Sequence, residues 1–182
     1  MLLLMLLITV VGTCLWAIPF FLAPTKGQGA LRRDRRARWG IGLQAVAYSI
    51  LWQGHFWERS PERWLIALSV TLFVLASAIS WTAARALGSH FRLDAAVDAT
   101  HELVKSGPYR IVRHPIYTSM LCLLLATGLL ISPPLLLSIA LIVFLAGAEI
   151  RMRIEDALLG AQFGPSFVDY KRHVPGLVPF LR

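Results

Sequence analysis

The segment with the most reactive side chains is residues 101–117, a polar stretch between two hydrophobic runs. It holds histidines, arginines and tyrosines, and ionisable groups at a membrane boundary usually mark a functional site. Gly107-Pro108 is typical of a turn, and Pro115 favours the first turn of a helix. His114 is therefore predicted at a helix entrance, where backbone N–H groups favour an anion. The pattern indicates a ligand-binding site.

A simpler interpretation of the basic residues is that they only anchor the chain at the membrane surface. Arg110, Arg113 and His114 would all suit that role. Basic residues by themselves do not separate the two interpretations. The tyrosines, the Gly-Pro turn and the His114-Pro115 step together favour a ligand site.

A second candidate pair, Arg151 and Glu155, is four residues apart and so lies on one face of a helix. The pair could be an ordinary ion pair that stabilises the helix by about 0.3–0.5 kcal/mol. Alternatively, Arg151 holds an anionic substrate while Glu155 binds a cation or a hydroxyl group, with Asp156 alongside. The spacing is compatible with both interpretations.

The histidines and cysteines do not predict a metal site. His90, His101 and His114 are separated by irregular gaps, whereas a metal centre needs several converging ligands. Cys14 and Cys122 both fall within predicted membrane spans, where we expect buried thiols and no disulfide framework.

Short motifs follow one another in order through the second half of the chain. The first group is His101-x-Leu-Val, Gly107-Pro-Tyr109 and Arg113-His-Pro-x-Tyr117. The second group is Arg151-x-x-x-Glu155-Asp156, Phe163-Gly164, Tyr170 and the tail Val174-Pro-Gly-Leu-Val-Pro179. In order and spacing the set resembles the isoprenylcysteine carboxyl methyltransferase family, which is related to phospholipid methyltransferases. The resemblance covers roughly residues 85–181.

This resemblance implies an integral membrane enzyme that binds S-adenosylmethionine without a Rossmann domain. The residues expected along the cofactor are His101, Glu102, Leu103, Val104, Tyr109, His114, Pro115, Ile116, Tyr117 and Glu155. Arg151 corresponds to the residue expected to engage the substrate, so Arg151 and Glu155 are the expected catalytic residues. The chain departs from the family at Asp156, where Glu is frequent, and it lacks the extra N-terminal spans of eukaryotic members. The identity of the acceptor therefore stays open.

The implied reaction is carboxyl O-methylation of an isoprenylcysteine-like or other lipophilic acceptor at the cytoplasmic membrane face. Aromatic rings such as those of Tyr109 and Tyr117 can stabilise a sulfonium cation. Methyl transfer is an in-line displacement that needs no metal, and a carboxylate acceptor is already ionised at neutral pH. The enzyme would contribute mainly alignment and exclusion of water.

Three alternatives remain. The first is a phospholipid N-methyltransferase of the same family. The second is an NADPH-dependent membrane reductase, although such enzymes usually carry Asn-Tyr where this chain continues with Pro115-Ile-Tyr117. The third is a non-catalytic membrane module, whose polar segment would tolerate substitution of His114 and Glu155.

Composition indicates which elements must position these residues. Hydrophobic residues make up 57% of the 182 residues, and the mean hydropathy is +0.64. Both values are typical of a polytopic all-α membrane protein, because runs of about 18 or more apolar residues form spanning helices. The sequence predicts five transmembrane helices, at roughly Leu2–Leu22, Trp39–Trp57, Trp64–Leu87, Ile116–Ser132 and Leu135–Ile150.

We expect one membrane domain over residues 1–182, with scaffold spans in 1–87 and the cofactor-binding and catalytic half in 88–182. The first run lacks a positive n-region and is predicted to be a retained span. After Ile150 a cytoplasmic amphipathic helix should continue to Gly164-Pro165, followed by a second short helix.

The net charge of +8 comes mainly from basic residues in the first loop, the third loop and the C-terminal segment. With five spans all three lie on one side, which the positive-inside rule makes cytoplasmic. The predicted location is a bacterial cytoplasmic membrane, with the N-terminus outside and the C-terminus in the cytoplasm. The basic residues then contact anionic lipid headgroups, and no nucleic-acid partner is expected.

Overall fold

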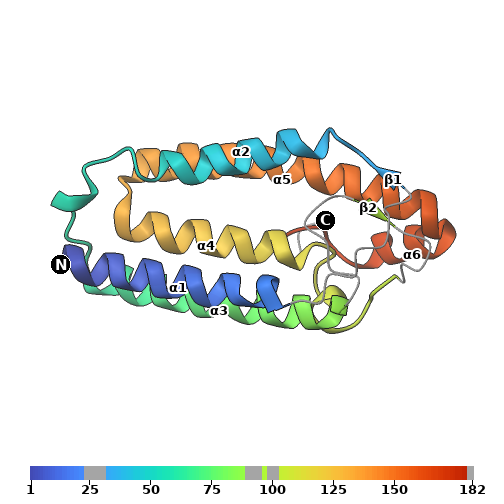
Figure 1. Cartoon of the computed structure of the whole chain (residues 1–182), viewed down its shortest axis with the longest axis horizontal. Helices are drawn as coiled ribbons and strands as arrows, with labels where there is room; N and C mark the ends of the chain where they lie inside the picture. The colour runs from blue at the N-terminus through green and yellow to red at the C-terminus, as the bar shows by residue number, and fades with distance from the viewer. Residues whose placement is uncertain (23–31, 89–95, 98–102, 180–182) are drawn as a thin grey trace.

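A computed structural model describes residues 1–22, 32–88, 96–97 and 103–179 of the chain. These residues form an elongated helical bundle (Figure 1). The α-helices are α1 Leu2–Leu22, α2 Ala37–Ile50, α3 Arg63–Leu87, α4 Pro115–Ile131, α5 Pro134–Phe163 and α6 Pro165–His173. The short elements are the 3-10 helices η1 Phe56–Glu58 and η3 Gly107–Arg110, and the antiparallel strands β1 Arg32–Arg33 and β2 Ala96–Val97.

The predicted all-α membrane architecture is confirmed. Helices α1, α3 and α5 are long and apolar enough to cross a membrane, and α4 is a shorter apolar helix of 17 residues. The predicted span from Trp39 to Trp57 is wrong in its second half. Helix α2 has 14 residues and ends at Ile50, where the chain turns before η1. At about 1.5 Å per residue, 14 residues reach about 21 Å, so five full spans remain a prediction.

Helix α5 unites two predicted elements, because the fifth span and the amphipathic helix are one continuous helix of 30 residues. It begins after Pro133 and ends at Gly164, whose φ of +51° breaks the helix at low cost in a residue without a Cβ. Pro165 then begins α6 at the position where proline suits a helix. Arg151 and Glu155 therefore lie in the continuation of α5 beyond the predicted fifth span.

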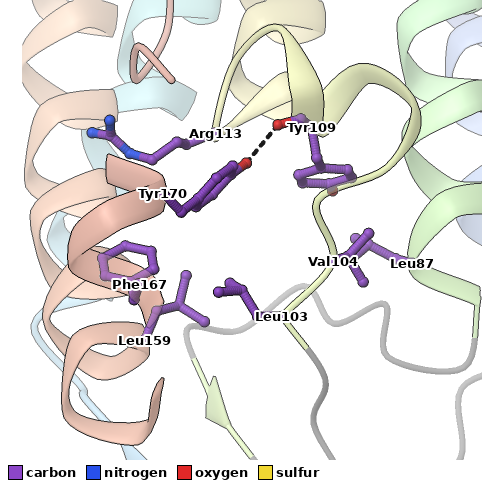
Figure 2. A pocket seen from close by; sticks show the side chains of 8 residues that line it. All are labelled: Leu87, Leu103, Val104, Tyr109, Arg113, Leu159, Phe167 and Tyr170. Carbon is purple, nitrogen blue, oxygen red and sulfur yellow. Dashed lines mark hydrogen bonds between the residues drawn. The ribbon is translucent and has the colours of Figure 1, made fainter. Parts of the chain in front are cut away.

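Next to the C-terminal end of α5, η3 lies against α6. The hydroxyl group of Tyr170 in α6 donates to the backbone carbonyl of Tyr109 in η3, at 2.6 Å (Figure 2). Both side chains are buried. This bond ties the connection before α4 to the C-terminal part of the chain.

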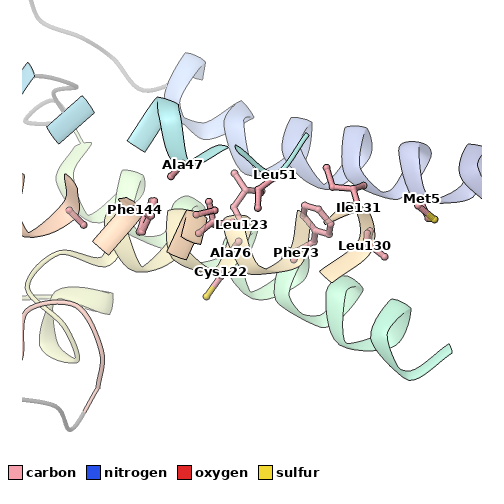
Figure 3. Packing of buried hydrophobic residues seen from close by; sticks show 14 residues of the cluster. Met5, Ala47, Leu51, Phe73, Ala76, Cys122, Leu123, Leu130, Ile131 and Phe144 are labelled. Atoms are coloured by element: carbon pink, nitrogen blue, oxygen red, sulfur yellow. The ribbon is translucent and has the colours of Figure 1, made fainter. Parts of the chain in front are cut away.

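Apolar residues from α1 to α5 share one core (Figure 3). Its larger members include Met5, Phe73, Leu124 and Phe144, each almost fully buried. Cys122 is buried in this core as predicted, but Cys14 is exposed on α1, so the prediction of a second buried thiol is wrong. The outward face of α1 is itself apolar, which is why hydropathy alone does not distinguish it from a buried face.

Helices α2 and α5 approach each other closely at two glycines. A Cβ added to Gly40 would lie 2.6 Å from the Gly147 carbonyl oxygen and 2.4 Å from Cγ of Arg151. A Cβ on Gly147 would lie 2.8 Å from the Gly40 carbonyl oxygen. Small residues permit such backbone contact between membrane helices. The contact fixes the position of the Arg151 side chain relative to α2.

Figure 1 places the N-terminus, the α2–α3 connection and the α4–α5 connection at one end of the bundle. Helix α6, the β1–β2 pair and the entrance of α4 lie at the other end. The basic segments that the structure describes therefore gather at the end that carries α6.

Candidate active site

The site lies where the entrance of α4 meets the last turns of α5, and His114 is at its centre. His114 precedes Pro115 directly and is 6% exposed. Its Nε2 lies 3.0 Å from Oδ1 of Asp156, and its Nδ1 lies 3.3 Å from Oε2 of Glu155. Only an imidazolium can donate from both ring nitrogens. The two carboxylates therefore favour a protonated, positively charged His114.

Two opposing effects set the pKa of His114. Burial alone would lower it, because a charged imidazolium is poorly solvated inside the protein. The hydrogen bonds and negative charges of Asp156 and Glu155 outweigh burial, so the pKa lies above its ordinary value of 6.5. The site thus holds a cation between two anions.

Asp156 is the shared partner of three basic side chains. Besides His114, its carboxylate is 3.2 Å from Nη2 of Arg113 and 2.8 Å from Nζ of Lys171 in α6. Asp156 is buried, and Lys171 is half exposed. One carboxylate therefore links α5 to both the entrance of α4 and α6.

Glu155 is the centre of the other half of the network. The hydroxyl group of Tyr117 donates to its Oε1, and Nη2 of Arg151 lies 3.8 Å from the same oxygen. The guanidinium carbon of Arg151 is 4.9 Å from the centre of the Tyr117 ring, a cation–π arrangement. The Tyr117 ring in turn stacks on His114, with ring centres 5.7 Å apart.

The C-terminal tail closes the entrance of α4. The backbone N–H groups of Arg113 and His114 donate to the carbonyls of Pro175 and Gly176, at 2.8 and 3.0 Å. The Thr118 hydroxyl donates to the Leu177 carbonyl at 2.6 Å. These bonds hold the tail against the residues that precede α4. The sequence resemblance included the tail but did not indicate this role.

A small pocket adjoins the network on the α6 side. Its walls are Leu87, Leu103, Val104, Tyr109, Arg113, Leu159, Phe167 and Tyr170 (Figure 2). Burial raises the pKa of Tyr170 to about 12, so its hydroxyl keeps its proton at neutral pH. The pocket encloses about 60 Å³, well below the roughly 300–1,000 Å³ typical of ligand pockets. Apart from Arg113, its lining consists of aliphatic and aromatic side chains.

The structure brings together five of the sequence-predicted residues, which are His114, Pro115, Tyr117, Arg151 and Glu155. Ile116 lies between them on α4 and is half-buried. Leu103, Val104 and Tyr109 line the adjacent pocket. His101 and Glu102 lie outside the described residues, as does His90.

Sequence reasoning missed three contributors: the shared role of Asp156, the contact of Lys171, and Gln44 of α2, whose Oε1 lies 3.4 Å from Nη1 of Arg151. A glutamine inside a predicted span was a usable signal for Gln44, because polar groups within membrane helices need partners. No pattern indicated Lys171. Among the described residues, no group of three or more His, Cys, Asp or Glu side chains could hold a metal ion.

Residues 64–166 match the phospholipid methyltransferase family. This segment runs from α3 into α6 and contains His114, Tyr117, Arg151, Glu155 and Asp156. The chain belongs to this family. The resemblance to isoprenylcysteine methyltransferases and their phospholipid-methylating relatives is thereby confirmed.

Several curated proteins are similar to the chain. Protein-S-isoprenylcysteine O-methyltransferase B of Arabidopsis thaliana is 30% identical over 121 residues, which cover 65% of this chain and 61% of the plant protein. The nickel-cobalt-cadmium resistance protein NccN of Alcaligenes xylosoxydans xylosoxydans is 26% identical over 168 residues, or 90% and 73% of the two chains. The mouse protein-S-isoprenylcysteine O-methyltransferase is 28% identical over 130 residues, covering 70% of this chain and 46% of the mouse protein.

Proposed function

We propose that this chain is an S-adenosylmethionine-dependent membrane methyltransferase that methylates the carboxylate of an isoprenylcysteine-like or other lipophilic acceptor. The observation that carries the proposal is the convergence of His114 and Tyr117 from α4 with Arg151 and Glu155 from α5. All four lie in the segment that matches the family. Similarity to isoprenylcysteine O-methyltransferases supports the carboxylate acceptor.

S-adenosylmethionine, when bound, supplies the transferable methyl group on a sulfonium. The residues that would hold it are His101, Glu102, Leu103, Val104, Tyr109, His114, Pro115, Ile116, Tyr117 and Glu155. Glu155 is suited to a cation or a ribose hydroxyl, and the aromatic ring of Tyr117 lies directly beside it. Burial of His114 and Tyr117 keeps water away from this side of the site.

Arg151 would orient the acceptor. Its side chain is 11% exposed, and its guanidinium can bind a carboxylate through two parallel hydrogen bonds. The methyl group that S-adenosylmethionine supplies would pass to one oxygen of the carboxylate held by Arg151, and the carbon–sulfur bonding pair would stay with the cofactor. No proton moves, so no general base is needed.

The position of the site at one end of the bundle suits a lipophilic acceptor. The site lies at the end of the bundle that gathers the basic segments, which the positive-inside rule assigns to the cytoplasm. A soluble cofactor could then enter from water and a lipidic acceptor from the bilayer. We infer a multi-pass protein of a bacterial cytoplasmic membrane with its C-terminus inside.

Phospholipid N-methylation is the second candidate, and the family match favours it. An amine nucleophile must lose a proton before it attacks, so this reaction needs a proton acceptor near the amine. Oε1 of Glu155 lies 3.8 Å from Nη2 of Arg151, so this carboxylate could accept the proton of an amine held there. The two reactions therefore differ in whether Glu155 takes a proton.

The test is calorimetric binding of S-adenosylmethionine, S-adenosylhomocysteine and NADPH to the detergent-purified chain. Micromolar binding of the two adenosyl ligands alone is expected. Transfer from labelled cofactor to N-acetyl-S-farnesylcysteine, compared with phosphatidylethanolamine, then separates O- from N-methylation. Binding of NADPH alone would assign a reductase, and binding of none of the three by a folded sample would favour a non-catalytic module.

A further inference from the structure

Gln44 is a buried polar side chain in α2 that has no part in the proposed cofactor or acceptor binding. It is 3% exposed and faces α5. Its Oε1 accepts a hydrogen bond from Nη1 of Arg151 at 3.4 Å. Its Nε2 is buried and has no hydrogen-bond partner within the described part of the chain. A buried amide N–H left without a partner costs about 1–3 kcal/mol.

The contact with Arg151 determines the orientation of the Gln44 amide. A guanidinium group only donates hydrogen bonds, so the amide must turn its oxygen toward Arg151. The Nε2 group is then left as a donor next to a cation. The close contact at Gly40 and Gly147 brings α2 against α5 one helical turn before Gln44.

The charges of the surrounding network favour an anionic ligand at this position. The basic groups are Arg113, His114, Arg151 and Lys171, and the acidic groups are Glu155 and Asp156. With His114 protonated, the described residues of this network carry four positive charges and two negative ones. One further carboxylate beside Arg151 would reduce this excess.

We propose that Gln44 is a specificity-determining residue that selects a carboxylate acceptor together with Arg151. One acceptor oxygen would bind the Arg151 guanidinium and the other Nε2 of Gln44. The inference rests on the proposed methyltransferase function and assigns a second residue that selects its carboxylate acceptor. A protonated amine offers no lone pair to Nε2 and would place a cation beside Arg151, so this pair of donors rejects it.

The same pair of donors distinguishes the substrate from its product. Methylation removes the negative charge of the carboxylate and blocks one of its oxygens. The methyl ester therefore keeps only part of the contacts to Arg151 and Gln44. We expect the free acid to bind about tenfold more tightly than its methyl ester, the amount that one hydrogen bond to a charged group can contribute.

The experiment compares binding of N-acetyl-S-farnesylcysteine and its methyl ester by calorimetry, in the presence of S-adenosylhomocysteine. The variants are Gln44→Met, which keeps the length but removes the amide, and Gln44→Glu, which puts a carboxylate beside Arg151. Ser49→Ala is the matched control, because Ser49 is exposed on the same helix and its hydroxyl group donates to the carbonyl of Ala45 one turn earlier.

We expect Gln44→Met to lose most of the tenfold preference for the acid and Gln44→Glu to abolish acid binding. S-adenosylhomocysteine affinity should stay within twofold of wild type in all three variants. An unchanged acid-to-ester ratio in Gln44→Met, even with lower thermal stability, would overturn the inference and leave Gln44 a packing residue.

Two further outcomes separate this inference from the proposed function. A wild-type protein that binds the adenosyl ligand but binds acid and ester equally would refute the role of Gln44 and leave the methyltransferase proposal intact. A folded wild-type protein that binds no adenosyl ligand would refute both.

Discussion

Helix α5 carries two Arg–Glu pairs of the same spacing on two different faces. Arg153 and Glu149 lie 2.6 Å apart with side chains 79% and 51% exposed. Arg151 and Glu155 lie 3.8 Å apart with side chains 11% and 25% exposed. The shorter contact is the exposed one, and the longer one belongs to the site. Neither spacing nor distance identifies the functional pair.

What differs between the two faces is the number of elements that meet there. The buried pair is joined by Tyr117 and His114 from α4 and by Gln44 from α2. Isolated helices favour Glu on the N-terminal side of its basic partner, which is the order of the exposed pair. The buried pair has the reverse order, so tertiary contacts must compensate for it.

Asp156→Ala should have the largest effect on stability. It leaves the buried His114 and the partly buried Arg113 without their shared carboxylate, and breaking a buried charged network typically costs about 3–5 kcal/mol. The matched control is Asp169→Ala, which removes only an exposed partner of His173 in α6 and should cost less than about 1 kcal/mol. Thermal unfolding in detergent measures both. Equal losses would mean that burial of the network contributes nothing.

Arg151→Ala should lower methyl transfer by at least about 100-fold while cofactor affinity stays within a few-fold of wild type. The change removes the side chain proposed to hold the acceptor, and a bidentate charged contact can account for such a loss. Arg153→Ala, the same substitution on the exposed face, should leave transfer unchanged. A methyl-transfer assay and a cofactor titration measure the two effects in each variant. A loss of cofactor affinity in Arg151→Ala as large as its loss of transfer would contradict this role.

Glu155→Ala and Tyr117→Ala should each weaken S-adenosylmethionine binding by about tenfold, because each removes one member of the bonded pair expected to contact the cofactor. Glu149→Ala is the control on the exposed face and should bind the cofactor as wild type does. Calorimetry supplies all three affinities. Wild-type affinity in both site variants would show that the cofactor does not contact Glu155 and Tyr117.

The smallest expected effect is a pH dependence of stability that arises from His114. Its raised pKa in the folded chain means that protonation stabilises the fold. This stabilisation is complete below the unfolded value of about 6.5 and is lost as pH rises through the folded pKa, by at most about 1.4 kcal/mol per pH unit.

The unfolding temperature of wild type should therefore fall as pH rises above about 6.5, and the slope should flatten in His114→Asn. His173→Asn, at an exposed position, should keep the wild-type slope. A slope that is the same in wild type and His114→Asn would assign the pH dependence to another group.

Much of the fold could be predicted because membrane helices follow local rules. Hydropathy located α1, α3 and α4 and the start of α5 to within a few residues. The fifth predicted span covered only the first half of α5, and Gly164-Pro165 marked the end of this helix. Hydropathy failed at α2, where the predicted span continued to Trp57 but the helix ends at Ile50, shortly before Gly54. It also failed at Cys14, because lipid-facing and buried positions of α1 are equally apolar.

The sequence by itself determined the class of the protein and the residues of the His114–Tyr117 and Arg151–Glu155 motifs, because residue types and short spacings are local properties. Only the tertiary structure decided which charges meet. The pairing of Asp156 with Arg113 and Lys171, and of Gln44 with Arg151, joins residues 15 to 107 positions apart in the chain. Such pairs depend on helix rotation and on the close approach at Gly40 and Gly147, which no single segment specifies.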